Sequence, residues 1–342
     1  AASSGPCVVE PLPLPRPAVN CVVVDRDGLV WVGGVRPVRL DPRATGAERS
    51  RLVEIPGPNT DVQDFALGAD GDLWIATGQG LVLLRRDGSA RLFELGPPNA
   101  GAAAVAVDGA GRLWVGARGG VYALVERTLL DERMDGAALA ERPTLHARGR
   151  PPARPGELPE RPGEILFYTA ADGLAGDFVY SIEASGDGER AVWIASRAGA
   201  TGFVDGTLRT ISAAQGLPEP AQMVALEDRD GAVWFGSESC GLTRLLPAGF
   251  VSYGLADGLA EERAAALFDG PDGALDVVTM SRNLHRFDGT RFDLLTPRML
   301  FPRHLSGWGW NQFVAADRRG AIWYPVHGAL YRFPPLADQR AL

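Results

Sequence analysis

Short apolar runs alternate with turns rich in Asp and Gly along almost the whole chain. Runs such as 21–24 and 65–68 precede an Asp-Gly turn, and a second run that carries a tryptophan follows it. The Asp-Gly pair supplies the positive-φ residues that a tight hairpin needs. A second turn with Gly, a third run such as 81–88 and a fourth such as 90–95 complete the unit. Each unit therefore predicts four short antiparallel strands.

The unit recurs seven times. Asp276 occupies the anchor position of the sixth copy, and the other copies have a tryptophan there: Trp31, Trp74, Trp114, Trp193, Trp234 and Trp323. Neighbouring anchors lie 40 to 47 residues apart, except for one interval of 79 residues. Four strands every ~40–45 residues are typical of a propeller blade. We therefore predict an all-β fold, a single seven-bladed β-propeller over residues 1–342, in which the tryptophans fill the gaps between blades.

The two ends of the chain are predicted to complete one blade together. The last copy supplies three strands, the third near 330–333, and residues 7–14 precede the first inner strand. We expect 7–14 to add the missing outer strand, an edge position where prolines cost few backbone hydrogen bonds. Cys7 and Cys21 would reinforce this seam as a disulfide in an oxidising compartment, and otherwise they are free buried thiols; Cys240 is left unpaired.

An insertion rich in Arg, Glu and Pro interrupts the repeats at 127–163 and accounts for the long interval. We place it between the third and fourth strands of blade three, with 164–169 resuming the blade. Residues 129–142 are predicted to form a short helix, and 151–163 to form an extended or mobile loop.

Composition removes several classes of function. The 34 basic residues, all arginine, against 42 acidic residues give a net charge of −8, and a nucleic-acid partner would require a basic surface. No run approaches the ~18 apolar residues of a membrane-spanning helix. The chain has no Gly-rich phosphate loop, paired CxxC, HExxH or GxSxG motif. We predict no cofactor and no resident metal.

Three segments, 168–196, 211–245 and 251–273, resemble two-component regulator propeller repeats. The family's hallmark is an aromatic residue shortly before Asp-Gly-Leu, then an inner strand and the pattern D-x-D-G-x-x-W-x-G-x-x-x-G-L. The resemblance is specific for copies four to six and looser for copies one, three and seven. It implies a non-catalytic sensor on the periplasmic or extracellular side of a bacterial inner membrane, acting within a full-length receptor that forms a homodimer.

The loops between the second and third strands of the blades carry different residues from blade to blade. Variable loops on a rigid scaffold usually carry function. We expect a ligand site at the axial mouth on this face, formed by Arg36, Arg118, Arg197, Glu238, Arg282 and His327, with Trp308 and Trp310 as a stacking platform on its rim. Such a mouth suits an anionic small molecule, a glycan or a peptide. Alternatively, the arginines are solvated and the two tryptophans pack on blade seven.

Two other classes of protein fit the same repeats. Streptogramin lyases are seven-bladed propellers that use a His and a divalent metal, and a similar enzyme would use His327 as the base with Glu238 or Glu261 near the metal. A scaffold propeller that binds other proteins is the third reading, although the Gly-His and Trp-Asp marks of WD repeats are absent.

Overall fold

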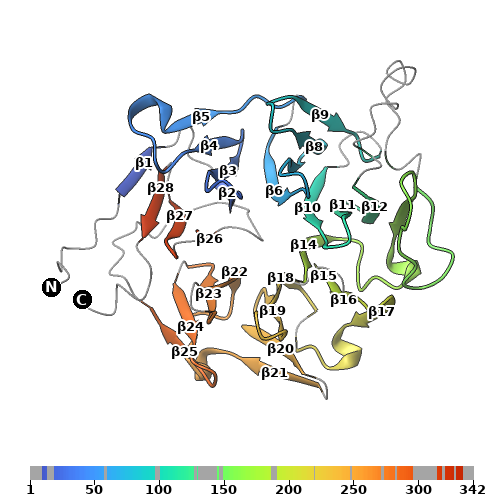
Figure 1. Cartoon of the computed structure of the whole chain (residues 1–342). Helices are drawn as coiled ribbons and strands as arrows, with labels where there is room; N and C mark the ends of the chain where they lie inside the picture. Colours follow the sequence, from blue (N-terminus) through green and yellow to red (C-terminus); the bar gives the residue numbers. More distant parts are fainter. Residues whose placement is uncertain are drawn as a thin grey trace.

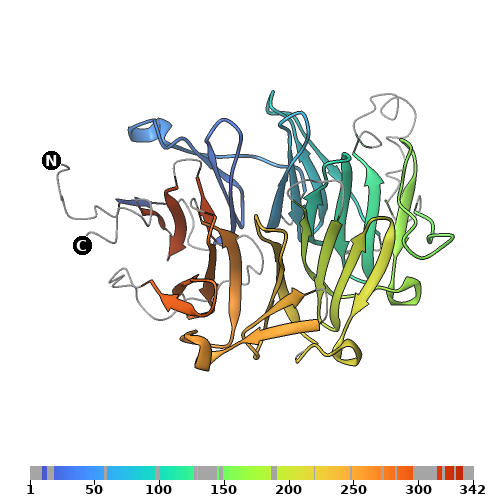
Figure 2. The same cartoon turned by 60° about the horizontal axis from the view of Figure 1, so that its bottom comes forward.

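The computed structural model describes the strands of every predicted blade. The described residues are 10–13, 19–57, 60–96, 101–126, 129, 145, 149–185, 191–218, 220–246, 249–270, 273–281, 283–295, 314–317, 320–326 and 329–333. Within them the strands form seven four-stranded antiparallel sheets around a common axis (Figure 1). Figure 2, a tilted view, shows the strands running between the two faces of the ring. The predicted all-β, seven-bladed propeller is confirmed.

Each blade follows the chain from the axis outward. Blades one to three consist of β2 (Val19–Val24), β3 (Val30–Gly34), β4 (Val38–Leu40) and β5 (Ser50–Leu52); β6 (Val62–Leu67), β7 (Leu73–Thr77), β8 (Gly80–Leu84) and β9 (Ala90–Phe93); and β10 (Ala102–Val107), β11 (Arg112–Ala117), β12 (Gly120–Val125) and β13 (Ile165–Tyr168). Blades four to six consist of β14 (Val179–Ala184), β15 (Ala191–Ser196), β16 (Gly199–Val204) and β17 (Thr207–Ile211); β18 (Gln222–Glu227), β19 (Val233–Ser237), β20 (Leu242–Leu246) and β21 (Gly249–Tyr253); and β22 (Ala264–Asp269), β23 (Leu275–Thr279), β24 (Leu284–Phe287) and β25 (Phe292–Leu294). Single 3-10 turns lie in the described connections at η1 (Gly46–Glu48), η3 (Ala170–Asp172), η4 (Ala213–Gln215) and η5 (Leu255–Asp257).

Blade seven combines the two ends of the chain, as predicted. It consists of β26 (Ala315–Ala316), β27 (Ile322–Val326), β28 (Ala329–Phe333) and, outermost, the N-terminal strand β1 (Glu10–Pro13). The antiparallel register runs from Glu10 opposite Arg332 to Pro13 opposite Ala329. The ring is therefore closed by backbone pairing between residues more than 300 positions apart. Cys7 lies outside the described residues, and Cys21 is a free, buried thiol.

The anchor tryptophans pack between neighbouring blades. Trp74, Trp114, Trp234 and Trp323 are fully buried, and Trp193 is nearly so. Each contacts apolar residues of the following blade; Trp323 packs with Val22 and Val30 of blade one, across the closure of the ring. Because the indole of one sheet is covered by the next sheet at these boundaries, these blades do not bury their apolar faces alone.

The aspartate of the first turn holds the anchor of its own blade. The indole Nε1–H of Trp31, Trp114, Trp234 and Trp323 donates to the carboxylate six residues earlier, over 2.7 to 3.2 Å. In blade one the other oxygen of this carboxylate, Asp25 Oδ1, accepts from the backbone N–H groups of Asp27 and Leu29. One side chain therefore closes the turn and satisfies the tryptophan.

Blades two and four lack this aspartate and take a carboxylate from the next blade. Gly68 and Ser185, which follow the inner strands β6 and β14 and close the turn there, stand in its place. Glu126 of blade three accepts from Trp74 Nε1 at 2.7 Å, and Glu227 of blade five accepts from Trp193 Nε1 at 3.3 Å. The indole N–H group therefore keeps a carboxylate acceptor, although the carboxylate comes from the following blade.

Blade six replaces the tryptophan itself. Asp276, in the anchor position, forms a buried bidentate ion pair with Arg286, with both N–O distances at 2.8 Å. This pair occupies the place of the indole in the gap between blades. A buried charge pair with two good hydrogen bonds avoids the penalty of an isolated buried carboxylate.

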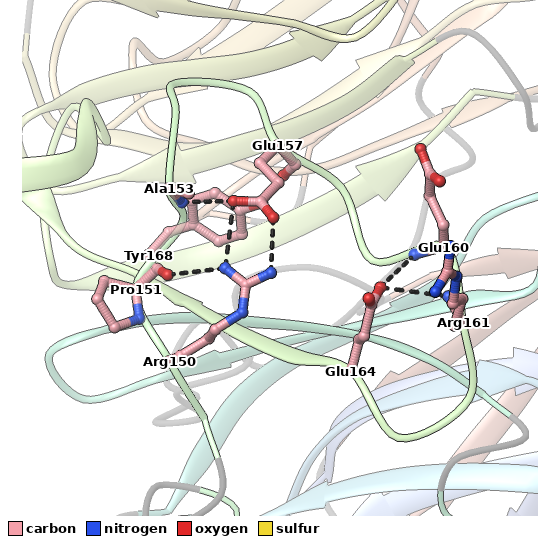
Figure 3. Close-up of polar contacts among 8 residues, drawn as sticks. All are labelled: Arg150, Pro151, Ala153, Glu157, Glu160, Arg161, Glu164 and Tyr168. Atoms are coloured by element: carbon pink, nitrogen blue, oxygen red, sulfur yellow. Dashed lines mark hydrogen bonds and ion pairs between the residues drawn. The ribbon is translucent and has the colours of Figure 1, made fainter.

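The second half of the insertion forms a loop, as predicted at 151–163, and carboxylates fix its turns. Glu157 pairs with Arg150 at 2.6 Å and also accepts from the backbone N–H of Ala153, and Glu164 accepts from the N–H groups of Glu160 and Arg161 (Figure 3). Arg150, the Ala153 N–H and neighbouring charges lower the pKa of Glu157 to about 2. Two carboxylates thus close successive turns by accepting from backbone N–H groups. The Pro-rich composition gives no sign of these bonds.

The insertion also ties blade three to blade four. Buried Gly156 lies against the backbone of residues 206–208, and Leu158 packs beside Leu208. Leu129 and Leu145 are buried against the core that blades two and three share. The rest of the predicted helix at 129–142 lies outside the described residues.

We predict that Glu126→Ala lowers the free energy of unfolding by about 2–3 kcal/mol, because the buried indole N–H of Trp74 loses its acceptor. Denaturant titration followed by circular dichroism measures this loss. Glu48→Ala, which removes an exposed carboxylate, is the matched control and should change stability by less than about 0.5 kcal/mol.

A second substitution sharpens the test. A Cβ at Gly68 would lie 2.4 Å from Glu126 Oε1, so Gly68→Asp should destabilise the protein while Glu126 is present. In the Glu126→Ala background the same Gly68→Asp change places an aspartate in the turn, as in blades one, three, five and seven. This aspartate can accept from the indole N–H of Trp74 and should recover stability. Additive losses in the double variant would contradict a shared role for the two positions.

Candidate functional site

One face of the ring brings together the variable loops and the connections between blades. The N–H of Gly119 donates to Asp177 O, and the N–H of Arg197 donates to Phe178 O. In the next blade, the N–H of Glu238 donates to Ala221 O at 3.2 Å. Each of these three loops is therefore fixed by backbone bonds to a segment that enters an inner strand.

Arg118, Arg197 and Glu238 are the predicted residues that the structure brings near one another. They follow the second strands of blades three, four and five, and all three side chains are exposed. Arg118 forms a backbone bridge with Phe178, which precedes β14 of blade four. Within the described residues, none of the three side chains has an ion-pair partner, so their charges face solvent at the mouth.

An aromatic pair that the sequence analysis missed lies within this cluster. The rings of Phe178 and Tyr180 meet edge to face, with centroids 5.1 Å apart, and Phe178 is 45% exposed. The register of β14 shifts between Val179 and Ser181, so Tyr180 sits at a bulge. Bulges redirect side chains next to functional sites. An exposed aromatic at the rim of a propeller mouth is a ready stacking surface.

The charged residues of the cluster act on the Tyr180 hydroxyl. Burial and the nearby Glu238 carboxylate raise the pKa of Tyr180, while Arg197 lowers it. Arg197 and Glu238 are therefore both close enough to affect the pKa of the Tyr180 hydroxyl. Arg118, Phe178, Tyr180, Arg197 and Glu238 form what we call the mouth cluster.

The other predicted site residues do not join the mouth cluster in the described structure. Arg36 belongs to blade one and pairs with exposed Glu54 at 2.7 Å. Arg282, His327, Trp308 and Trp310 lie outside the described residues. The predicted stacking platform at 308 and 310 therefore stays a prediction, and Phe178 and Tyr180 are the aromatics seen at this face.

Carboxylates gather on the inner strands, close to the axis. Burial, with help from Asp64, Asp269 and Glu227 on other blades, raises the pKa of Glu183 to about 8. Burial also raises the pKa of Asp269 to about 6. Within the described part of the chain, no group of three or more His, Cys, Asp or Glu residues could hold a metal ion.

Of the residues named for a lyase mechanism, Glu238 and Glu261 are described, and His327 lies outside the described residues. Glu261 Oε2 accepts from the N–H of Ser281 at 2.7 Å. The loop that carries Glu238 is bonded to the neighbouring residue, with the N–H of Gly241 donating to Glu262 O. His285 is buried and its Nε2 accepts from the N–H of Ala260, and burial lowers its pKa. That ring serves as a neutral packed acceptor. Among the residues described, no helix combines the length and apolarity needed to span a membrane.

The fold and this face define a seven-bladed β-propeller with a polar, aromatic axial mouth. No family model and no curated protein matches the chain. Solved structures do. The chain is similar to the extracellular domain of the hybrid two-component system BT3049 from B. thetaiotaomicron, with a TM-score of 0.72 and 16% identity over 99% of this chain and 43% of that one.

Two further structures show how widely the fold is used. The extracellular domain of BT4673 from B. thetaiotaomicron matches with a TM-score of 0.68 and 14% identity, over 96% of this chain and 42% of that one. Virginiamycin B lyase from Staphylococcus aureus, in a catalytically inactive form with quinupristin, matches at 0.69 and 13% identity over 96% and 99%. The chain thus spans about two fifths of the length of these extracellular domains, and at these identities the likeness shows the fold alone.

We expect the pKa of Tyr180 to move in opposite directions in two variants. Glu238→Gln should lower it and Arg197→Gln should raise it, because each substitution removes one of the charges that act on the phenol. Absorbance titration of tyrosinate, with Tyr180→Phe to assign the signal, measures the shifts. Glu261→Gln is the control on the same face and should leave Tyr180 unchanged; equal effects from all three would contradict the cluster.

A pH dependence of stability follows from Glu183. Its folded pKa lies above the ordinary value of 4.5, so between about pH 4.5 and 8 the folded protein retains a proton that the unfolded chain releases. Stability must therefore fall as pH rises through this window. We predict that Glu183→Gln removes about 1–3 kcal/mol of this fall. Unfolding titrations at about pH 5 and about pH 8.5 measure it, and parallel profiles for variant and wild type would contradict the assignment.

Proposed function

We propose that this chain is a non-catalytic, extracytoplasmic ligand-sensing propeller of a two-component-type signalling protein, and that it binds its ligand at the mouth cluster. The observation that carries the proposal is the convergence of Arg118, Arg197 and Glu238, from three successive blades, around the exposed Phe178. Exposed, unpaired charges beside an aromatic ring on fixed loops are a means of recognition.

The composition of the mouth cluster suggests the ligand class. Two guanidinium groups can bind carboxylate or sulfate with directed hydrogen bonds. The Phe178 ring and the neighbouring Tyr180 offer a surface for a sugar ring or a peptide side chain. An anionic oligosaccharide or an acidic peptide satisfies both features.

The likeness to extracellular domains of two-component systems supports the sensing role and the periplasmic or extracellular location. Those domains are more than twice as long as this chain. A sensor of this kind would pass the binding event to neighbouring parts of a receptor, in which a homodimer is the expected assembly.

A metal-dependent lyase is the second candidate function. The observation in its favour is that the lyase fold matches over nearly the whole of both chains. The mouth cluster would then be a substrate site, with Glu238 near a metal and His327 as the base.

Thermal melting with a panel of sulfated oligosaccharides, carboxylated oligosaccharides and acidic peptides tests the proposal. Binding to the folded state raises the melting temperature. We expect at least one member of the panel to do so in wild type and not in Arg197→Ala or Phe178→Ala. Arg209→Ala, which removes an exposed arginine of the outer strand β17, is the control and should behave as wild type. A shift that survives both mouth variants would overturn the site.

Turnover separates the enzyme from the sensor. The protein is incubated with quinupristin and Mg²⁺, and liquid chromatography with tandem mass spectrometry follows opening of the ring, because elimination across the ester leaves the mass unchanged. The sensor proposal expects intact quinupristin, and opening that depends on the metal would favour the lyase.

A further inference from the structure

The boundary between blades one and two differs from the other boundaries. Trp31 is partly exposed, whereas the other anchor tryptophans are buried. Trp74, Trp114, Trp193 and Trp234 each pack against another aromatic ring. Within the described residues Trp31 has no such ring contact. Its blade covers it poorly because β4 and β5 have only three residues each.

A cavity of about 380 Å³ lies beside Trp31, between blades one and two. Trp31, Arg39 and Arg51 form one wall; they lie opposite one another on β3, β4 and β5 and so share one face of blade one. The other wall, from blade two, includes Leu67, Leu73 and Leu84 together with Arg85 and Arg86. The volume falls in the range of small-molecule sites.

The two arginines leave positive charge without a partner in this cavity. Neither Arg39 nor Arg51 forms an ion pair or a side-chain hydrogen bond with the described residues. The carboxylates of the lining are already engaged: Asp25 with Trp31, Asp27 with Arg86 at 2.8 Å, and Glu54 with Arg36 at 2.7 Å. Asp41 lies close enough to feel Arg39 but pairs with Arg43.

Like charges directly opposite on neighbouring strands destabilise a sheet. Elsewhere in the ring, arginines at the position of Arg39 are used locally: Arg244 lies over Trp234 and Arg332 lies over Trp323, and Arg286 pairs with Asp276. At the boundary between blades one and two, an aromatic face and two guanidinium groups are therefore accessible to a ligand together.

We propose that this cavity is a second ligand site, separate from the mouth cluster, that binds a small planar acid: an aromatic or flat apolar ring bearing a carboxylate or sulfonate. The ring lies between the Trp31 indole and the leucines of blade two, and the anionic group accepts hydrogen bonds from Arg39 and Arg51. The leucines favour a ligand with an apolar ring over a strongly hydrated anion such as free phosphate.

Calorimetric titration with 2-naphthoate tests the site, with the neutral isostere 2-naphthamide as the ligand control. We expect one saturable site for naphthoate and binding of naphthamide weaker by about tenfold or more, since a charge-assisted pair is lost. Arg39→Gln and Arg51→Gln should each weaken naphthoate binding by about fivefold or more. Arg209→Gln is the matched variant, because Arg209 has the same place in the fourth strand of blade four, and it should bind as wild type.

A second readout locates the ligand. In ¹H–¹⁵N spectra naphthoate should shift the indole N–H signal of Trp31 and leave that of Trp114 in place. Absence of saturable binding, binding unchanged in Arg39→Gln and Arg51→Gln, or a shift of Trp114 instead of Trp31 would overturn the proposal. The arginines are exposed, and unchanged melting temperatures confirm that the variants fold.

Discussion

The bond between each anchor indole and a carboxylate is the constraint on which the ring depends. A tryptophan large enough to fill the gap between two sheets buries an N–H group, and a buried donor without an acceptor costs about 1–3 kcal/mol. Where the turn aspartate is present it supplies the acceptor. Where Gly68 and Ser185 replace it, Glu126 and Glu227 of the following blade do so. Packing and polar satisfaction therefore link neighbouring blades, and β1 closes the chain of links by pairing with β28.

A ring held in this way leaves its loops free to vary. The segments that carry Arg118, Arg197 and Glu238 are fixed by backbone hydrogen bonds, so their side chains can differ without disturbing the sheets. The bulge at the start of β14 places Tyr180 beside them, and Phe178 stands next to it at the rim. The site proposed for ligand sensing thus consists of side chains that the fold does not need. The proposed site between blades one and two differs, because it uses a structural residue. Trp31 anchors its blade but is only partly buried, so a ligand can reach it.

The repeat made most of the fold predictable, whereas the departures from the repeat could be seen only in the structure. The spacing of the tryptophans and the Asp-Gly turns predicted the blades and their closure, since both depend on local patterns repeated seven times. Glu126 could not be identified as the acceptor for Trp74, because the two are 52 residues apart in sequence and only the gap at Gly68 hints at a substitute. The folded turns of 151–163 were missed because their carboxylate caps lie in a segment whose prolines suggested extension. Phe178 and Tyr180 were not predicted because they lie within the repeat, whereas Trp308 and Trp310 lie outside the repeat's tryptophan position.

Exchange of the indole N–H protons with solvent, followed residue by residue by NMR, tests the account most directly. If each indole is locked between blades by a carboxylate, the protons of Trp74, Trp114, Trp234 and Trp323 exchange only when the whole ring unfolds, and their rates give one common free energy. The proton of Trp31, beside the open cavity, exchanges much faster through local motion. Rates that differ widely among the four buried indoles, or a Trp31 proton as well protected as theirs, would contradict the account.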